Sequence, residues 1–171
     1  GFNQALYEKE ISSLSSSSKS AYTSFVSNLS SSNGTVLYYA VDNALDAIKE
    51  VEMPEDLVNV SVITFTDGLD QGSIMLNTKY TTNSAYLSAV NSRIKSEKVK
   101  GIPITAYSIG LRGNDVTDVA QFQANLKSLA SSDANAIEVS DISEVNAKFN
   151  EIANDVYNES SSSTVGLTIP G

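Results

Sequence analysis

The chain contains no cysteine and no histidine among its 171 residues. Without cysteine the protein has no disulfide framework, no thiolate zinc site and no thiol nucleophile. Without histidine it lacks the most common zinc ligand and the most common general base. Together these two absences exclude most hydrolytic catalytic triads as the basis of its function.

Basic residues are few, and long apolar runs are missing. Eleven Lys and Arg against 20 Asp and Glu give a net charge of −9, which disfavours long-range attraction to nucleic acid or anionic lipid. No apolar run approaches the about 18 residues of a transmembrane helix, and the first residues do not have the pattern of a signal peptide. We therefore expect no nucleic-acid partner and no membrane span, and partners that are proteins, glycans or metal ions.

What the chain does have is the size and composition of one soluble globular domain. Hydrophobic residues make up 41% and charged residues 18% of the sequence, which are ordinary values for such proteins. A chain of this length can bury a substantial core. We therefore expect a single compact unit.

Residues 58–70, VNVSVITFTDGLD, organise the rest of the chain. Their β-branched and apolar residues predict a strand over residues 58–66 that helices bury on both sides. The strand ends at Asp67 and Gly68, and a second carboxylate follows at Asp70. Ligands in open α/β sheets gather outside the carboxyl ends of the strands, so Asp67 is a candidate cation ligand. An ordinary Asp-Gly turn is the alternative.

Helical and strand patterns alternate along the chain. Apolar spacing predicts helices over residues 18–29, 35–53, 84–99, 116–131 and 141–157, and strands over residues 102–110 and 136–139. Asp115 is expected to cap the fourth helix, and Asp141 with Glu144 the last. This order predicts right-handed crossovers and a largely parallel sheet covered on both sides.

Three segments are less regular. Residues 5–11 could form a strand at a sheet edge, and residues 71–83 form a polar loop long enough to be functional. Residues 160–163 are typical of a serine linker, and residues 164–171 of a strand beyond it. We therefore place one domain over residues 1–158, and a linker with the start of a following segment over residues 159–171.

Four motifs between about residues 7 and 157 resemble parts of a von Willebrand factor A domain. Residues 33–38, NGTVLY, resemble its G-T-x-L-Y at the head of a helix, and residues 63–68, ITFTDG, its strand ending in T-D-G. Residues 104–110, ITAYSIG, with Leu129 and Ala130 in the following helix, are similar to its next strand and helix. Residues 136–140, with Ile142 and Phe149, fit its final strand and helix.

The resemblance implies an α/β fold of Rossmann-like von Willebrand factor A type, a mainly parallel sheet with helices on both faces. It also implies a metal-ion-dependent adhesion site (MIDAS), usually with magnesium. The family's ligands are an Asp-x-Ser-x-Ser loop after the first strand, a threonine before a helix, and an aspartate at a later strand end. Thr35 matches the threonine and Asp67 the later aspartate.

These two residues suit the metal chemically, because octahedral Mg²⁺ accepts hydroxyl, carboxylate and water oxygens and can keep a position for a partner's carboxylate. We expect Mg²⁺ or another divalent cation at Thr35 and Asp67, with their side-chain oxygens about 4–6 Å apart. Asp70 is expected to be a solvated loop carboxylate, and contact with a metal ligand is the alternative.

The Asp-x-Ser-x-Ser loop itself does not occur where the family has it. No aspartate precedes the serines of residues 12–20, and residues 141–143, Asp-Ile-Ser, are interpreted as a helix cap. We therefore expect the first strand, its metal loop and the first helix to be missing from the N-terminal side. The remainder of a longer chain, or another segment, would then fill the gap in the sheet.

The leading hypothesis is a non-enzymatic, metal-assisted binding module of a longer extracellular or cell-surface protein, a bacterial surface protein included. Its partner would be a protein or another carboxylate-bearing ligand. One alternative is a structural scaffold with no functional metal site. The other is a magnesium-dependent phosphotransfer enzyme with Asp67 as nucleophile, although such sites usually have a second carboxylate nearby.

Overall fold

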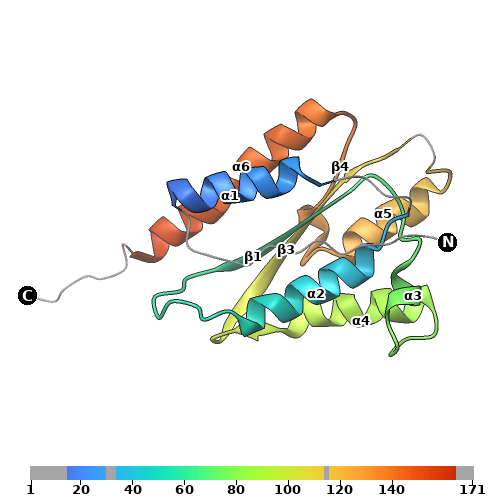
Figure 1. The fold of residues 1–171 in the computed structure, drawn as a ribbon, viewed down its shortest axis with the longest axis horizontal. Helices are drawn as coiled ribbons and strands as arrows, with labels where there is room; N and C mark the ends of the chain where they lie inside the picture. Colours follow the sequence, from blue (N-terminus) through green and yellow to red (C-terminus); the bar gives the residue numbers. More distant parts are fainter. Residues whose placement is uncertain (1–14, 30–33, 114–115, 165–171) are drawn as a thin grey trace, which may run out of the picture.

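The computed structural model describes residues 15–29, 34–113 and 116–164, so the predicted strand at residues 5–11 and the cap at Asp115 lie outside it. A three-strand parallel sheet with a short antiparallel addition is packed between helices (Figure 1). The helices are α1 (Ser16–Ser27), α2 (Leu37–Glu50), α3 (Ser73–Leu76), α4 (Asn83–Ser96), α5 (Val119–Ser128) and α6 (Ile142–Thr164), with a 3-10 turn, η1 (Asp133–Asn135); the strands are β1 (Val60–Thr66), β2 (Lys98–Val99), β3 (Ile102–Leu111) and β4 (Ala136–Val139).

Strand β3 is the centre of the sheet. It pairs in parallel with β1, from Val60 opposite Ile104 onward, and in parallel with β4, from Ser108 opposite Ala136 onward. The short strand β2 joins β3 in an antiparallel pair through a tight turn, in which Lys100 and Gly101 have φ of 49° and 83°. The predicted α/β architecture with a mainly parallel sheet is confirmed.

One face of the sheet is covered by α2, α4 and α5. Alternate residues of a strand point to opposite faces, and on this face the buried side chains of β1 and β3 include Val60, Val62, Ile104 and Ala106. At Gly110 a Cβ atom would lie 2.7 Å from side-chain atoms of Phe122 and of Leu126 in α5. Helix α5 thus packs at a distance from β3 that only glycine allows.

The opposite face is covered by α6, but only over part of its width. Val145 and Ile152 of α6 pack against Tyr107 and Ile109 of β3 and Val139 of β4. The rest of this face belongs to β1, and no described helix covers it.

On that part of the face, Ile63 and Phe65 of β1 remain 38% and 44% exposed. The prediction that helices bury β1 on both sides is therefore wrong. Its physical reason is that α6 runs over β3 and β4, and no other described helix lies over β1. Val58, at 46% exposed, lies outside the strand, which begins at Val60 rather than at residue 58.

Most predicted helices are confirmed, with ends that differ by a few residues. The loop predicted over residues 71–83 contains α3, and the end of the helix predicted over residues 84–99 is β2. Helix α5 begins at Val119, and its N-cap is Asp118 rather than the predicted Asp115: the side chain of Asp118 accepts a hydrogen bond from Gln121 N at 2.9 Å. Helix α6 continues through residues 160–163 instead of ending before them. Each serine in a helix is only about 0.5 kcal/mol less favourable than alanine, so a serine-rich segment can still extend a helix.

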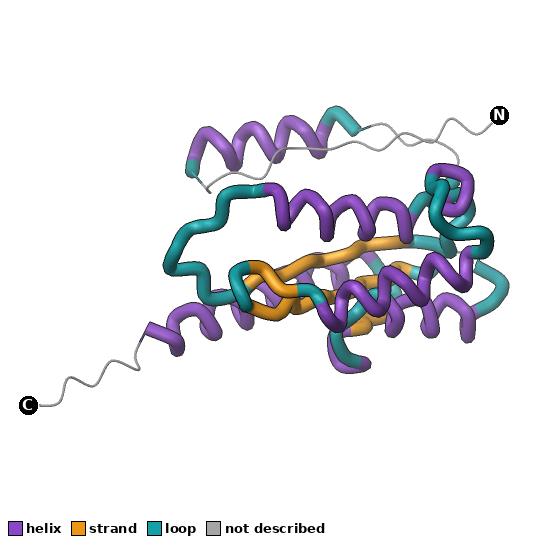
Figure 2. Tube along the Cα trace, turned by 90° about the horizontal axis from the view of Figure 1, so that it is seen from below, coloured by secondary structure: helices purple, strands orange, loops and turns teal. Residues whose placement is uncertain are grey.

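The helix predicted over residues 18–29 is confirmed as α1, but none of its residues is buried. Ser15 and Ser18 form a capping box at its start, and Val26 is 63% exposed. Helices α1 and α6 overlap in Figure 1, but Figure 2 shows them far apart. Local capping, rather than packing, therefore accounts for α1.

None of the helices in the described ranges combines the length and the apolar character that crossing a bilayer requires.

Candidate metal site at the carboxyl end of β1

The segments that carry Thr35 and Asp67 meet at the carboxyl end of β1. Thr35 lies just before α2, and Asp67 directly follows the last residue of β1. The carbonyl oxygen of Thr35 accepts hydrogen bonds from Gln71 N at 2.8 Å and from Gly72 N at 3.1 Å. These bonds attach the loop after Asp67 to the head of α2, so both residues lie at one end of the sheet.

Asp67 occupies the tip of a turn that its neighbours close. The hydroxyl of Thr66 donates to the carbonyl of Gly68 at 2.9 Å, and the carbonyl of Asp67 accepts from Gly113 N at 2.9 Å. Asp67 is exposed and Thr35 is half-buried, and neither side chain hydrogen bonds to another residue in the described ranges. The carboxylate of Asp67 is therefore held at a fixed backbone position while its oxygens face solvent.

Asp70 is not the solvated loop carboxylate that the sequence suggested. It is half-buried, and its oxygens accept hydrogen bonds from Tyr38 N and Ser73 N, each at 3.2 Å, and from the Ser73 hydroxyl. The hydroxyl of Ser73 in turn accepts from Tyr39 N at 2.9 Å. Val36, the N-cap of α2, has no side chain that can accept these bonds, so Asp70 and Ser73 satisfy the first turn of α2 in its place.

Beneath this loop, Tyr38 connects α2 to α5. Its phenol oxygen accepts a hydrogen bond from Asn125 Nδ2 at 2.9 Å, and both residues are buried. Burial, and after it the negative charge of Asp70, raise the pKa of Tyr38 to about 12, although the hydrogen bond from Asn125 works in the opposite direction. Tyr38 thus stays a neutral phenol at physiological pH and is not a base.

The donor set suits a divalent cation in kind but not in number. The Thr35 hydroxyl and the Asp67 carboxylate are the oxygen donors that Mg²⁺ prefers. Within the described residues, however, no three acidic side chains come together to hold a metal. Octahedral coordination at Thr35 and Asp67 would need water and donors from another segment to complete it.

Asp141 imitates a metal motif in sequence but acts as a helix cap, as predicted. One of its carboxylate oxygens accepts from Ser143 N at 2.8 Å and from Glu144 N at 3.1 Å. The Ser143 hydroxyl, followed by these backbone bonds, holds the pKa of Asp141 below its usual range. Glu144 accepts from Ser140 N at 2.6 Å, rather than from Asp141 N as a standard capping box would have it.

A pocket of about 720 Å³ lies at the carboxyl ends of β3 and β4. Neither Thr35 nor Asp67 lines it. Its charged residues engage one another or the backbone, since Arg112 pairs with Glu138 at 3.5 Å and Glu144 bonds to Ser140. The pocket therefore adds no free carboxylate to the candidate metal site. Its lining residues are Arg112, Gly113, Val116, Glu138, Val139, Ser140 and Glu144.

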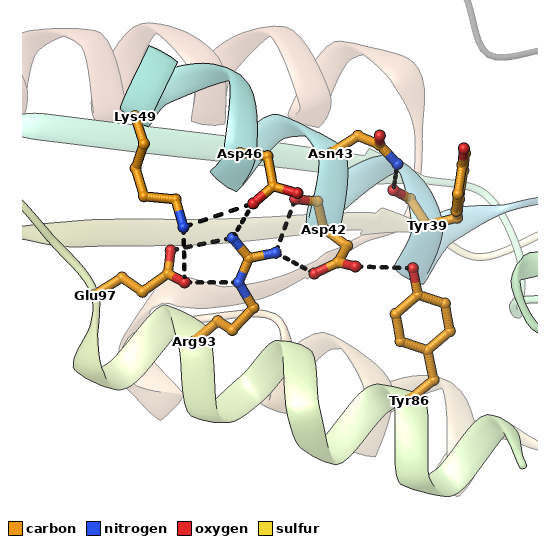
Figure 3. Close-up of polar contacts among 8 residues, drawn as sticks. All are labelled: Tyr39, Asp42, Asn43, Asp46, Lys49, Tyr86, Arg93 and Glu97. Atoms are coloured by element: carbon orange, nitrogen blue, oxygen red, sulfur yellow. Dashed lines mark hydrogen bonds and ion pairs between the residues drawn. The ribbon is translucent and has the colours of Figure 1, made fainter. Parts of the chain in front are cut away.

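Sequence reasoning missed a charged cluster between α2 and α4, centred on Arg93 (Figure 3). The guanidinium of Arg93 pairs with Asp42, with Asp46 at 2.6 Å and with Glu97 at 2.7 Å. Lys49 adds a contact to Glu97 at 3.3 Å, and the Tyr86 hydroxyl donates to Asp42 at 3.1 Å. The charged face of α2 is thus partly an interface with α4, and the acidic pair Asp42 and Asp46 at i, i+4 was the signal for it.

The pKa values in this cluster follow from its charges. Burial alone would raise the pKa of Asp46 and of Glu97, but hydrogen bonds and charges from Arg93 and Lys49 outweigh burial and lower both. For Arg93, burial would lower the pKa, and its bonds to Glu97, Asp42 and Asp46 raise it instead. All three side chains are consequently charged at neutral pH and hold the two helices together.

Comparison with protein-family models finds no match for this chain, and comparisons with curated proteins and with solved structures find none either. The von Willebrand factor A resemblance therefore rests on the chain's own motifs and on the arrangement of the elements that carry them.

Proposed function

We propose that the chain belongs to a metal-assisted binding module of von Willebrand factor A type. In it, Thr35 and Asp67 hold Mg²⁺ or another divalent cation, and the cation binds a protein or another carboxylate-bearing ligand. The observation that supports this proposal most strongly is the pair of backbone bonds from Gln71 and Gly72 to Thr35, which joins the two ligand-bearing segments at one end of the sheet.

The chemistry follows from charge. The protein carries a net charge of −9, which repels an acidic partner. A cation at Asp67 would reverse the local sign and accept the partner's carboxylate at an open coordination position. The exposed Asp67 and the hydroxyl of Thr35 would hold that cation, together with water and a loop from a first strand of a longer, extracellular or cell-surface protein.

The test uses Mn²⁺ as a paramagnetic substitute for Mg²⁺ on the 171-residue chain. Two protein donors bind weakly, so millimolar Mn²⁺ should broaden the NMR amide signals around Thr35 and Asp67 before others, and excess Mg²⁺ should reverse the effect. Asp67→Ala should abolish this selective broadening. Asp56→Ala, which removes an exposed carboxylate before β1, at the strand's opposite end, should leave it intact.

In a parent protein that contains the first strand and its loop, Asp67→Ala should abolish Mg²⁺-dependent partner binding and leave the fold intact. A strand-end carboxylate exposed to solvent contributes little to the core, so the circular dichroism spectrum should not change. If chelator and Asp67→Ala both leave binding unaffected, the adhesion-site proposal is wrong.

A scaffold without a functional metal site is the second candidate. It is favoured by Asp70, whose carboxylate is fully engaged at the first turn of α2, and by the described residues, among which no three acidic side chains are placed to hold a metal ion. The same engagement weighs against phosphotransfer by Asp67, which would need a second acidic ligand. Unselective Mn²⁺ broadening that Asp67→Ala does not alter would favour the scaffold.

A further inference from the structure

We propose that Asp67 and Gly68 form a site of spontaneous covalent modification, at which the aspartate converts to isoaspartate through a cyclic imide. The reaction needs only these two residues and water, so it is independent of the metal-site proposal. Only its effect on cation binding rests on the proposed function.

The sequence favours this reaction at one aspartate above the others. Asp67 is the only aspartate of the chain that a glycine follows. Ring closure requires the amide nitrogen of the following residue to reach the side-chain carboxyl carbon, Cγ, of the aspartate. Glycine has no Cβ to hinder this approach and adopts more backbone conformations than other residues. The residue after Asp67 therefore obstructs the reaction least.

The carboxylate of Asp67 is also free to react. It is exposed and bonds to no other residue in the described ranges. By contrast, Asp70 accepts hydrogen bonds from Tyr38 N and Ser73 N, and Asp141 caps α6 through two backbone N–H groups. Those bonds would have to break before either carboxyl group could reach the next peptide nitrogen. Asp67 has no such bonds to break.

The nitrogen of Gly68 is weakly restrained. It donates to the Thr66 hydroxyl at 3.3 Å, which is longer than the about 2.7–3.2 Å of typical N–H···O hydrogen bonds. A Cβ atom at Gly68 would meet no other atom within 4 Å, so the turn has room beside this residue. Asp67 and Gly68 lie outside both helices and strands, and no ladder of backbone hydrogen bonds fixes the peptide between them.

One hydrogen bond opposes the reaction. The main-chain carbonyl of Asp67 accepts from Gly113 N at 2.9 Å, and this bond restricts rotation of the peptide through which the ring closes. The reaction therefore proceeds during the local openings that exposed loops undergo in the folded state. It should be slow, and faster at residue 67 than at any other described aspartate.

The chemistry balances with water alone. The Gly68 nitrogen attacks Cγ of the protonated Asp67 carboxyl group, a C–N bond forms, and the carboxyl hydroxyl leaves with the amide proton as one water molecule. Water then adds to the main-chain carbonyl carbon of Asp67 and breaks its bond to Gly68, so the chain continues through Cγ. The second step takes up as much water as the first releases, and no oxidant or reductant takes part.

The product changes the turn permanently. The carbonyl that accepts from Gly113 N becomes part of the free carboxylate, and the main chain gains one carbon atom between residues 67 and 68. The carboxylate therefore leaves the position that Asp67 has in the proposed cation site. On the proposed function, conversion to isoaspartate inactivates this site as the protein ages.

Site-resolved digestion tests the proposal on the folded 171-residue chain, incubated in metal-free buffer at physiological pH. An endoproteinase that cleaves before aspartate does not cleave before isoaspartate. We expect progressive loss of cleavage before residue 67 and full cleavage before Asp56 and Asp70. Asp56 is the internal control, because it is exposed like Asp67 but is followed by Leu57. In water labelled with heavy oxygen, the isoaspartyl peptide should carry at least one labelled oxygen atom, as the imide route requires.

Gly68→Ala tests the mechanism. Its methyl group hinders the approach of the residue 68 nitrogen to Cγ of Asp67, while the fold has room for it. The loss of cleavage should therefore slow severalfold, and the circular dichroism spectrum should not change. In the unmodified chain, urea well below the unfolding transition should leave the rate unchanged, because only the turn has to open.

Three results would overturn the proposal. The first is equal retention of cleavage before residues 56, 67 and 70. The second is an equal rate in Gly68→Ala and in the unmodified chain. The third is a rate at residue 67 that rises in proportion to the unfolded fraction in urea, because the conversion would then belong to the unfolded chain and not to this turn.

Discussion

Asp70 shows how a single carboxylate can serve the fold while its neighbour Asp67 stays free. Asp70→Ala removes the acceptor for Tyr38 N and Ser73 N, so we expect it to lower the free energy of unfolding by about 1–2 kcal/mol. The pKa of Tyr38 should fall as well, because the charge of Asp70 raises it. Urea unfolding and the ultraviolet titration of tyrosine measure the two effects.

Asp67→Ala is the matched control for that experiment, since the exposed carboxylate of Asp67 bonds to no other described side chain or backbone group. It should change the free energy of unfolding by less than about 0.5 kcal/mol. Equal effects of the two substitutions would contradict the distinct roles assigned to these carboxylates.

Gly110 sets the distance between β3 and α5. A methyl group at this position would lie 2.7 Å from side-chain atoms of Phe122 and Leu126, so Gly110→Ala should lower the free energy of unfolding by about 1–3 kcal/mol. Gly68→Ala, where a Cβ meets no atom within 4 Å, should be neutral or slightly stabilising. Thermal unfolding of the two variants measures the difference, and similar melting temperatures would show that α5 moves away freely.

At the scale of elements, the Arg93 cluster determines how firmly α2 holds α4. Arg93→Met keeps much of the apolar stem but removes the charge that Asp42, Asp46 and Glu97 share. Because the cluster is only partly buried, we expect a loss of about 1–3 kcal/mol in the free energy of unfolding. Lys148→Met, which removes an ion pair with Glu151 on the surface of α6, is the control and should cost less than about 1 kcal/mol.

The same cluster predicts a dependence of stability on acid. The pKa values of Asp46 and Glu97 are lower in the folded state than their usual values of 3.8 and 4.5. Their contribution is therefore complete above these usual values and is lost as the pH falls through the lower values of the folded protein. Urea unfolding between pH 7 and pH 3 should show this decline, and Arg93→Met should flatten it. Parallel curves for the two proteins would exclude the cluster as its source.

Periodicity predicted most elements because their burial is one-sided. The stripe of α2 with Leu37, Val41 and Leu45 is buried as its spacing requires. The parallel sheet followed from the alternation of helices and strands. Burial of β1 on both faces could not be judged in this way, because Ile63 and Phe65 have the same apolar character whether or not a helix lies over them.

The candidate site was less predictable than the fold. Strand ends and crossover rules placed Thr35 and Asp67 at one end of the sheet, but the engagement of Asp70 depends on a local turn that brings it to Tyr38 and Ser73. The ion pairs of Arg93 were not predicted because its partners Asp42 and Asp46 belong to another helix. Amphipathic spacing alone does not distinguish a face exposed to solvent from one that forms ion pairs with a neighbouring helix.

At the scale of the whole molecule, β1 has neither a second partner strand nor a helix over one of its faces among the described residues, and this should limit stability. We expect the 171-residue chain alone to unfold in a broad thermal transition whose midpoint depends on protein concentration, because exposed sheet edges associate. Circular dichroism at two concentrations about tenfold apart measures this dependence. A sharp, concentration-independent transition of a monodisperse monomer would contradict this expectation.

The central place of β3 also constrains how the chain is assembled during synthesis. Val60 of β1 pairs with Ile104 of β3, which is synthesised 44 residues later. Strand β4 also pairs with β3, so both parallel pairings require β3. The sheet's one short-range pairing in the described ranges is the turn at Lys100 and Gly101 between β2 and β3. In a nascent chain, the apolar sides of α2 and β1 therefore stay exposed until β3 has left the ribosome. During this interval the chain exposes the most apolar surface to a chaperone.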